Sequence, residues 1–148
     1  MSGSLVHSPA QILQYLLIQL SQGTLPSDAG SWPIYTSETP NKPDICITTL
    51  DTSGMDAGRT SPDNERQEFH GIQVLIRASD HSSGYTKSRA IAIALDGVAR
   101  ISTTISSSVY HIQSIKRTSD VIVVGTDKPE GKRSLFTVNC LATIRQTV

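Results

Sequence analysis

Two hydrophobic periods follow one another in the middle of the chain and predict a strand that leads into a helix. From Phe69 to Ala78, apolar and polar positions alternate with the period of two that a pleated strand requires. One face of this strand carries Ile72, Val74, Ile76 and Ala78. After a predicted turn at residues 79–84, apolar positions recur with the spacing of an amphipathic helix, at Ile91, Ala94, Leu95 and Val98. We expect this helix to lie against the strand.

Another helix is predicted near the N-terminus, over residues 9–21. Ser8 suits the N-cap, the proline after it suits the first helical position, and Gln11 can reach back as in a capping box. A broad apolar stripe, typical of a helix packed in a core, consists of Ile12, Leu13, Leu16, Leu17 and Leu20. The alternative is a helix that also contacts a neighbouring subunit through Tyr15 or Ile18.

Several shorter stretches have strand patterns. Three of them are Ile34–Thr36, Ile45–Leu50 and Val109–Lys116. At the C-terminus, residues 121–145 are predicted to form a β-hairpin, whose first arm, the continuous apolar run Val121–Val124, fits a strand covered on both faces. The second arm, Leu135–Ile144, alternates, and one face carries Phe136, Val138, Cys140, Ala142 and Ile144. Residues 102–108 are polar and are predicted to be a connection.

Residues 51–67 are predicted to be a long loop. They contain glycine, proline and several acids, and Met55 is the one candidate core residue among them. Loops of this length are uncommon in compact domains unless they are functional or disordered. Two interpretations remain open, a mobile loop and an arm that becomes ordered against a partner.

The order of these elements predicts the fold class. We expect a single domain, residues 1–148, with an α+β fold. It should contain a mixed, largely antiparallel β-sheet of about five to six strands with two helices packed on one face. A chain of 148 residues with 37% hydrophobic residues is long enough to bury one core.

Charge is balanced over the whole chain but not within it. The formal net charge is zero, which gives no general electrostatic reason to bind nucleic acid or a membrane, and we expect neither sequence-specific nucleic-acid binding nor membrane binding. Residues 1–68 hold three bases and eight acids, a net charge of −5 (3 − 8), whereas residues 69–148 hold ten bases and five acids, a net charge of +5 (10 − 5). The two halves therefore carry opposite charge.

No pattern in the sequence predicts catalysis, a metal or a cofactor. Cys46 and Cys140 each lie inside a predicted strand, which favours buried free thiols, and the four histidines lack metal-ligand spacing. Gly125–Ser134 resembles a phosphate loop but has five residues between its glycines, and a strand follows it. We therefore expect a protein that is not an enzyme, with a small hydrolase using His81 or His111 as the alternative.

The location is predicted from the absence of transport signals. No stretch approaches the roughly 20 apolar residues of a membrane span, and the N-terminus lacks the basic and apolar regions of a signal peptide. We expect the chain to be made and kept in the cytosol.

The C-terminal hairpin carries a family resemblance. The run Val124–Asn139 resembles the final hairpin of small tail terminator or minor capsid proteins of tailed bacteriophages. In that family an apolar strand ends in a G-x-D turn, here Gly125–Asp127, and a long alternating strand with an asparagine follows a glycine-containing tip. The resemblance also covers the N-terminal helix, the early strands and the central strand and helix. Residues 128–130 are additional to the family's pattern, and Phe136 is the one aromatic residue of the last strand.

The resemblance implies a structural virion protein of the tail or neck region, assembled in the host cytoplasm. As a tail terminator it would form a homohexameric ring on the end of the tail tube, stop tail polymerisation and join the tail to the head connector. Its partners would be other copies of itself, the tail tube protein, a head connector or stopper protein and, in a contractile tail, sheath-side proteins. The alternatives are another neck or head-completion protein of the connector and, in a different class, a small monomeric or dimeric binding domain.

The opposite charges of the two halves suggest how the subunits of such a ring would be oriented. Closed rings use head-to-tail contacts, in which two different patches of the same chain meet. We expect acids of the first half to face bases at the hairpin tip of the next subunit. The candidate interface residues are Asp56, Arg59, Asp63, Glu65, Arg66, Lys128, Glu130, Lys132 and Arg133.

Overall fold

The computed structural model describes residues 5–28, 30–40, 43–59, 66–127 and 133–147, without the side chains of 55–59, 66–68, 127, 146 and 147. Its elements are α1 (Pro9–Gln19), β1 (Ile34–Thr36), β2 (Cys46–Arg59), β3 (Arg66–Ala78), α2 (His81–Asp96), β4 (Ala99–Ile105), β5 (Ser108–Arg117), β6 (Ile122–Asp127) and β7 (Arg133–Thr147). The α+β fold class is confirmed, and β4 is a strand in addition to the six predicted.

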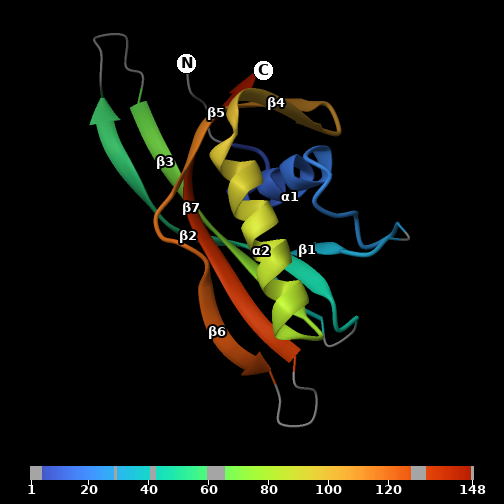
Figure 1. Cartoon of the computed structure of the whole chain (residues 1–148). Coiled ribbons are helices and arrows are strands. Elements are labelled where there is room, and N and C mark those ends of the chain that lie inside the picture. Colours follow the sequence, from blue (N-terminus) through green and yellow to red (C-terminus); the bar gives the residue numbers. More distant parts are fainter. Residues whose placement is uncertain (1–4, 29, 41–42, 60–65, 128–132, 148) are drawn as a thin grey trace.

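The strands form one mixed, largely antiparallel sheet. Their order is β1-β2-β3-β7-β5-β4, with β6 also paired to β7, and only the described pair β1–β2 is parallel. β3 pairs with one edge of β7 along most of its length. The other edge of β7 is shared by β5 and β6. There β5 pairs with residues 140–147 and β6 with residues 133–137. The two strands thus follow one another along β7 (Figure 1).

The helices and the inner face of the sheet enclose the core. In Figure 1, α2 lies over β7, while α1 contacts β4 where the sheet curls. The predicted inner faces of β3 and β7 are confirmed, because Val74, Ile76, Phe136 and Val138 are all 0% exposed. Complete burial of one such side chain contributes about 1.5–3 kcal/mol to the free energy of unfolding.

Side-chain oxygens define where both helices begin. Ser8 is the N-cap of α1, as predicted, and its Oγ accepts a hydrogen bond from the backbone N–H of Gln11 (3.2 Å). The predicted turn at residues 79–84 is wrong, since α2 already begins at His81. Asp80 is its N-cap: Oδ1 accepts from the backbone N–H of Ser83 (2.7 Å), and this bond lowers the pKa of the Asp80 carboxyl. An acidic N-cap favours the helix start at this position.

The predicted loop at residues 51–67 is largely strand. β2 continues to Arg59 and β3 begins at Arg66, and the two pair over most of this length with two irregularities in register. Hydrogen bonds between paired backbones need no apolar side chains, so two polar strands can pair beyond the core. We call this extension, residues 51–59 of β2 with residues 66–72 of β3, the β2–β3 ribbon. Gly54 lies at the first irregularity, where a Cβ atom would be 2.1 Å from the carbonyl oxygen of Phe69.

The predicted connection at residues 102–108 is also mostly strand. β4 runs to Ile105, and a turn at residues 106–107 leads into β5. Its buried positions alternate, with Thr103 and Ile105 facing the core. The hydrophobic alternation of β4 is hard to recognise in the sequence because three of its seven residues are serine or threonine.

Arg77 anchors the segment before β2 on the face of the sheet opposite the helices. Its Nη2 donates to the carbonyl oxygens of Pro40 and Pro43 (both 2.6 Å), and its Nε donates to that of Asp44 (3.2 Å). Arg77 is 3% exposed, and these carbonyl oxygens accept hydrogen bonds from its buried guanidinium. Asp44 is thereby held close to the start of β7.

Candidate assembly interface

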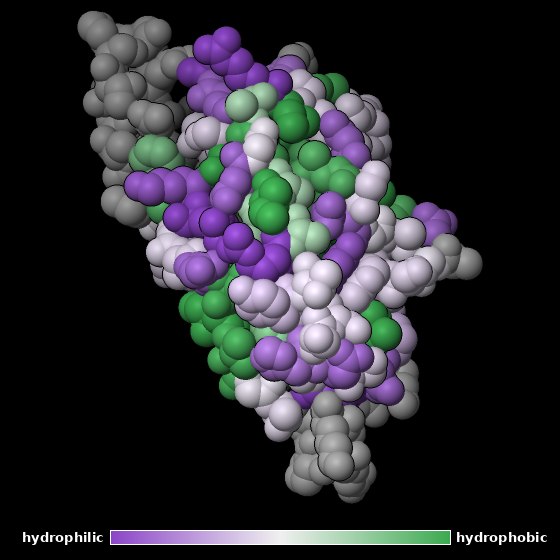
Figure 2. Space-filling view, viewed as in Figure 1, coloured by the Kyte–Doolittle hydropathy of each residue, from purple (hydrophilic) through white to green (hydrophobic). Residues whose placement is uncertain are grey.

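β6 exposes an apolar surface that the sequence pattern predicted to be buried. Ile122, Val123 and Val124 are 43%, 51% and 54% exposed, so the expectation of a strand covered on both faces is wrong. The predicted hairpin with β7 is confirmed, but β7 covers only one edge of β6. Figure 2 shows an apolar patch over the region that β6 occupies in Figure 1.

Other edges of the sheet are protected within the chain. β1 has three residues, and the backbone of Ile34 donates to Thr24 O (2.8 Å) and accepts from Gln14 Nε2 (2.6 Å). On β4, Ser102 O accepts from Gln19 Nε2 (3.2 Å). Among the described residues, none caps the outer edge of β6 in this way. Natural proteins usually shorten, cover or charge such edges, so the bare apolar edge of β6 is the strongest candidate for a protein contact.

α2 contacts the strand and the turn that adjoin β6. Val123 pairs in register with Phe136, whose ring lies 6.4 Å from that of Tyr85, a half-exposed residue of α2. At the preceding turn, Asp120 lies 3.2 Å from Arg89 of α2. The backbone N–H of Val121 donates to Asp120 and lowers the pKa of its carboxyl. The turn before β6 and the part of β7 that pairs with β6 therefore both lie against α2.

A second ion pair fixes β5 to the end of α2. Arg117 lies 2.8 Å from Asp96, and this hydrogen bond raises the pKa of the Arg117 guanidinium. Both ends of the turn before β6 are therefore tied to the same helix.

The structure brings few of the predicted interface residues together. Asp56, Arg59 and Arg66 belong to the β2–β3 ribbon, and Arg59 and Arg66 are cross-strand partners in its backbone. This ribbon and the β6–β7 hairpin lie at opposite ends of the sheet in Figure 1. The remaining predicted residues, apart from Arg133, lie outside the described residues: Asp63, Glu65, Lys128, Glu130 and Lys132.

Arg133 is engaged inside its own chain. It is 4% exposed, and its Nη1 lies 3.2 Å from Asp44 Oδ1. A glutamate at this position would face Asp44, so a charge reversal of Arg133 would disturb the subunit itself. The prediction of an interface at the hairpin tip therefore depends on residues 128–132, and Arg133 does not contribute an accessible charge to it.

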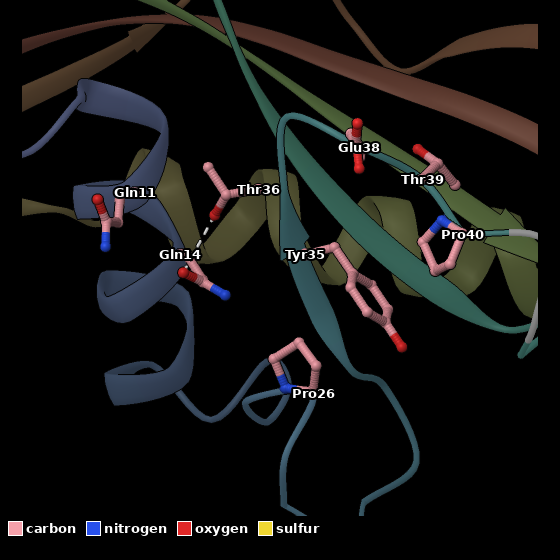
Figure 3. Close-up of a pocket in the computed structure, with 8 residues that line it drawn as sticks. All are labelled: Gln11, Gln14, Pro26, Tyr35, Thr36, Glu38, Thr39 and Pro40. Carbon is pink, nitrogen blue, oxygen red and sulfur yellow. Dashed lines mark hydrogen bonds between the residues drawn. The ribbon is translucent and has the colours of Figure 1, made fainter.

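A hollow of about 740 Å³ lies between α1 and the β1 edge (Figure 3). The side chain of Gln14 lies at the base of this hollow. Its Oε1 accepts a hydrogen bond from Thr36 Oγ1 (3.1 Å), and its Nε2 donates to the carbonyl oxygen of Ile34 in β1 (2.6 Å). The described lining residues are Gln11, Gln14, Pro26, Tyr35, Thr36, Glu38, Thr39 and Pro40. Glu38 is the one carboxylate among these described lining residues, and the other side chains are neutral.

The candidate catalytic groups are dispersed. His7 Nδ1 lies 2.5 Å from Tyr110 Oη, His81 stacks with Tyr85, and His111 Nδ1 lies 2.7 Å from Ser102 Oγ. In the described part of the chain, no group of three or more histidine, cysteine or acidic residues could hold a metal ion. Cys46 and Cys140 are buried free thiols, as predicted, and burial raises the pKa of Cys140 to about 12.

Comparisons with known proteins do not assign a family. Neither protein-family models nor curated proteins match this chain. Within the described residues, neither helix has the length and apolar character needed to cross a bilayer. The functional interpretation therefore depends on the surfaces of the molecule and on the resemblance of its hairpin.

Proposed function

We infer that this chain is a structural virion protein, a tail terminator that forms a ring on the end of the tail tube. In this role it stops tail polymerisation and joins the tail to the head connector. The resemblance of the C-terminal hairpin supports the family, and the exposed apolar edge of β6 supports assembly through protein contacts. The single observation that carries the proposal is this apolar edge, which no residue in the described part of the chain caps.

The size of the β6 surface fits a subunit contact within a ring. Ile122, Val123 and Val124 are each about half exposed. Since full burial of such a side chain contributes about 1.5–3 kcal/mol, covering the three would contribute roughly 2–4 kcal/mol per contact. Backbone hydrogen bonds along the strand edge would add about 0.5–1.5 kcal/mol each. Such a contact is weak alone, and a closed ring repeats it at each subunit.

The alternatives make different demands on the same surface. Another neck or head-completion protein would also assemble through β6, but on a different ring of the connector. A small monomeric or dimeric binding domain would use the edge for a foreign strand, by β-augmentation. None of these roles requires a catalytic group.

Native mass spectrometry and sedimentation of the purified chain test the proposal. We expect a species of six chains of 16.0 kDa, or 96 kDa. Val123→Lys should shift the distribution to monomer, because the new ammonium group would be desolvated in the contact. The matched control is Val6→Lys, which changes an apolar residue that is 71% exposed and lies outside the sheet.

Two outcomes would refute the proposed ring. One is a wild-type chain that stays monomeric or dimeric over the micromolar to millimolar range. The other is a ring that Val123→Lys leaves intact, which would remove β6 from the contact. Electron micrographs of labelled phage particles then distinguish a position at the tail end from another position in the neck.

A further inference from the structure

The edge of β6 is completed most directly by another strand edge, through backbone hydrogen bonds. Besides β6 itself, the described part of the sheet offers three edges in a second copy, those of β1, of β4 and of the β2–β3 ribbon. The backbone of β1 is already bonded to Thr24 and Gln14, and that of β4 to Gln19. The ribbon is therefore the edge best suited to meet β6.

The β2–β3 ribbon leaves one edge of β2 open. β1 pairs with β2 from Ile47 to Thr49, and no described strand pairs with the same edge beyond that point. The residues from Asp51 to Gly54 are all exposed. β2 nevertheless continues as a strand to Arg59, because β3 pairs with its other edge. An already formed strand with an open edge is therefore available for a contact with a second copy.

Hydrogen bonds to α1 hold the base of the ribbon. Asp51 Oδ1 accepts a hydrogen bond from the backbone N–H of Ala10 (2.9 Å), in the first turn of α1. Thr49 Oγ1 donates to the carbonyl oxygen of the same Ala10 (2.7 Å). A carboxylate is favoured at this end of a helix, where backbone N–H groups point outwards. The point at which the ribbon leaves the core is therefore attached to α1 on both sides of Leu50.

The positions of the ribbon and of β6 favour a head-to-tail contact. The two lie at opposite ends of the sheet in Figure 1. A contact between two different surfaces of the same chain leaves one of each surface open for the next copy, and it can therefore be repeated until a ring closes. A contact between two β6 edges is isologous, occupies both surfaces at once and produces a dimer. The ribbon contact thus agrees with the proposed ring, and this inference rests on that proposed function.

The charges and apolar residues of the ribbon also favour β6 as its partner. Residues 51–68 hold two bases and five acids, a net charge of −3 (2 − 5), so two ribbons would repel each other. Residues 121–132 hold two bases and two acids and are neutral (2 − 2). Beyond the core, Met55 and Phe69 are partners in the backbone register of the ribbon, and such partners share one face. The otherwise polar ribbon therefore has an apolar position that suits the exposed apolar run of β6.

We propose that the open edge of β2 in the ribbon of one copy, residues 51–56, pairs with the open edge of β6 in the next copy. The sheet of each copy then continues into the sheet of its neighbour. The contact is short, because the pairing of β2 with β3 is irregular after Thr52 and that of β6 with β7 is irregular after Val123. The partner that covers the apolar run of β6 is thus a second copy of this chain.

Cysteine cross-linking of the intact chain with a short bismaleimide tests this contact. Thr52→Cys and Val124→Cys in one chain place a thiol at an exposed position of each edge, while the native Cys46 and Cys140 are 0% and 2% exposed. We expect a ladder of covalent species up to six chains. Each of the two variants alone should remain a single chain of 16.0 kDa, because two equal edges do not meet in a head-to-tail contact.

Two further pairs of substitutions complete the experiment. Thr52→Cys with Thr126→Cys uses another exposed position of β6 and leaves the apolar run unchanged, so it should also give the ladder. The matched control is Gln113→Cys with Val124→Cys, in which one thiol lies at an exposed position of β5 outside the proposed contact. This control should give no ladder.

Native mass spectrometry before the reagent is added separates this inference from the proposed ring. If rings form but Thr52→Cys gives no ladder with either Val124→Cys or Thr126→Cys, the ribbon contact is wrong and the ring is held by another surface. Dimers cross-linked by Val124→Cys alone would also overturn the ribbon contact, in favour of two β6 edges that meet. A wild-type chain that forms no ring at all refutes the proposed function together with this inference.

Discussion

Replacement of Gly84 by alanine gives the sharpest test of how α2 packs on the sheet. Gly84 lies in the first turns of α2 and is buried against β7. A Cβ atom at this position would lie 2.4 Å from Cε2 and 2.9 Å from Cδ2 of Phe136, and 3.1 Å from Cβ of Ala78. Helix propensity alone predicts that Gly84→Ala stabilises the protein, whereas packing predicts the opposite. The sign of the effect therefore separates the two influences.

The magnitude follows from two opposing terms. Alanine in place of glycine inside a helix gains about 1 kcal/mol. Overpacking of a filled core costs about 1–3 kcal/mol. Phe136 is 0% exposed and its ring contacts His81 and Tyr85, so it cannot move aside without disturbing them. We expect the upper part of that range, and thus a net loss of about 1–2 kcal/mol.

Urea unfolding followed by circular dichroism measures this difference. The control is Gly97→Ala at the C-cap of α2, where the nearest atoms to a new Cβ lie 3.6 and 3.8 Å away and φ is −84°. This control should be neutral or more stable than wild type by up to about 1 kcal/mol. Phe136→Leu lacks the ε carbons and should reduce the cost of Gly84→Ala by about 1 kcal/mol in a double-mutant cycle. A Gly84→Ala protein more stable than wild type would refute this packing.

Two further predictions concern the last strand. Val138→Asp should prevent folding, because Val138 is fully buried opposite Val74 and a buried unpaired carboxylate is strongly unfavourable; a soluble Val138→Asp protein that melts cooperatively would contradict this facing, and Asn139→Asp on the outer face is the control. Burial raises the pKa of Cys140 from 9.0 to about 12, so between these pH values the unfolded thiol loses its proton while the native thiol keeps it. Stability should therefore fall as pH rises from 9 towards 12, and Cys140→Ala should show a smaller fall in urea unfolding at pH 10.5 relative to pH 8, whereas an equal fall would exclude this thiol as the cause.

The elements with a regular hydrophobic period could be predicted from the sequence. β3 and β7 alternate strictly on the face that packs against the helices, so their inward residues were identified correctly. The sequence predicts too late a start for α2 because Ser82, Ser83 and Gly84 are weak helix formers. The Asp80 N-cap and the contact of Gly84 with Phe136 outweigh that local preference.

The β2–β3 ribbon could not be predicted from the same signal. Its strands continue past the core with polar residues from Asp51 onwards, where nothing in the side-chain pattern separates a strand from a loop. Pairing there comes from the partner backbone, which is a tertiary effect. The charge pattern predicts an interface on residues of this segment and of the hairpin tip. The sequence does not reveal that Arg133 is buried, because its partner Asp44 lies 89 positions away in the chain.

The apolar run of β6 shows why a candidate assembly surface escapes sequence analysis. A continuous run of four apolar residues is typical of a strand buried on both faces, and only the topology reveals that β6 is an edge. A chain that functions alone would be expected to protect that edge, as it does at β1. The pairing of β6 with β7 has a bulge between Val123 and Gly125, and the φ of Gly125 is 126°. This bulge interrupts the regular backbone geometry along the edge of β6. Only a short strand contact can therefore form at β6, which favours a partner held in place by further contacts, as a neighbouring subunit in a closed ring would be.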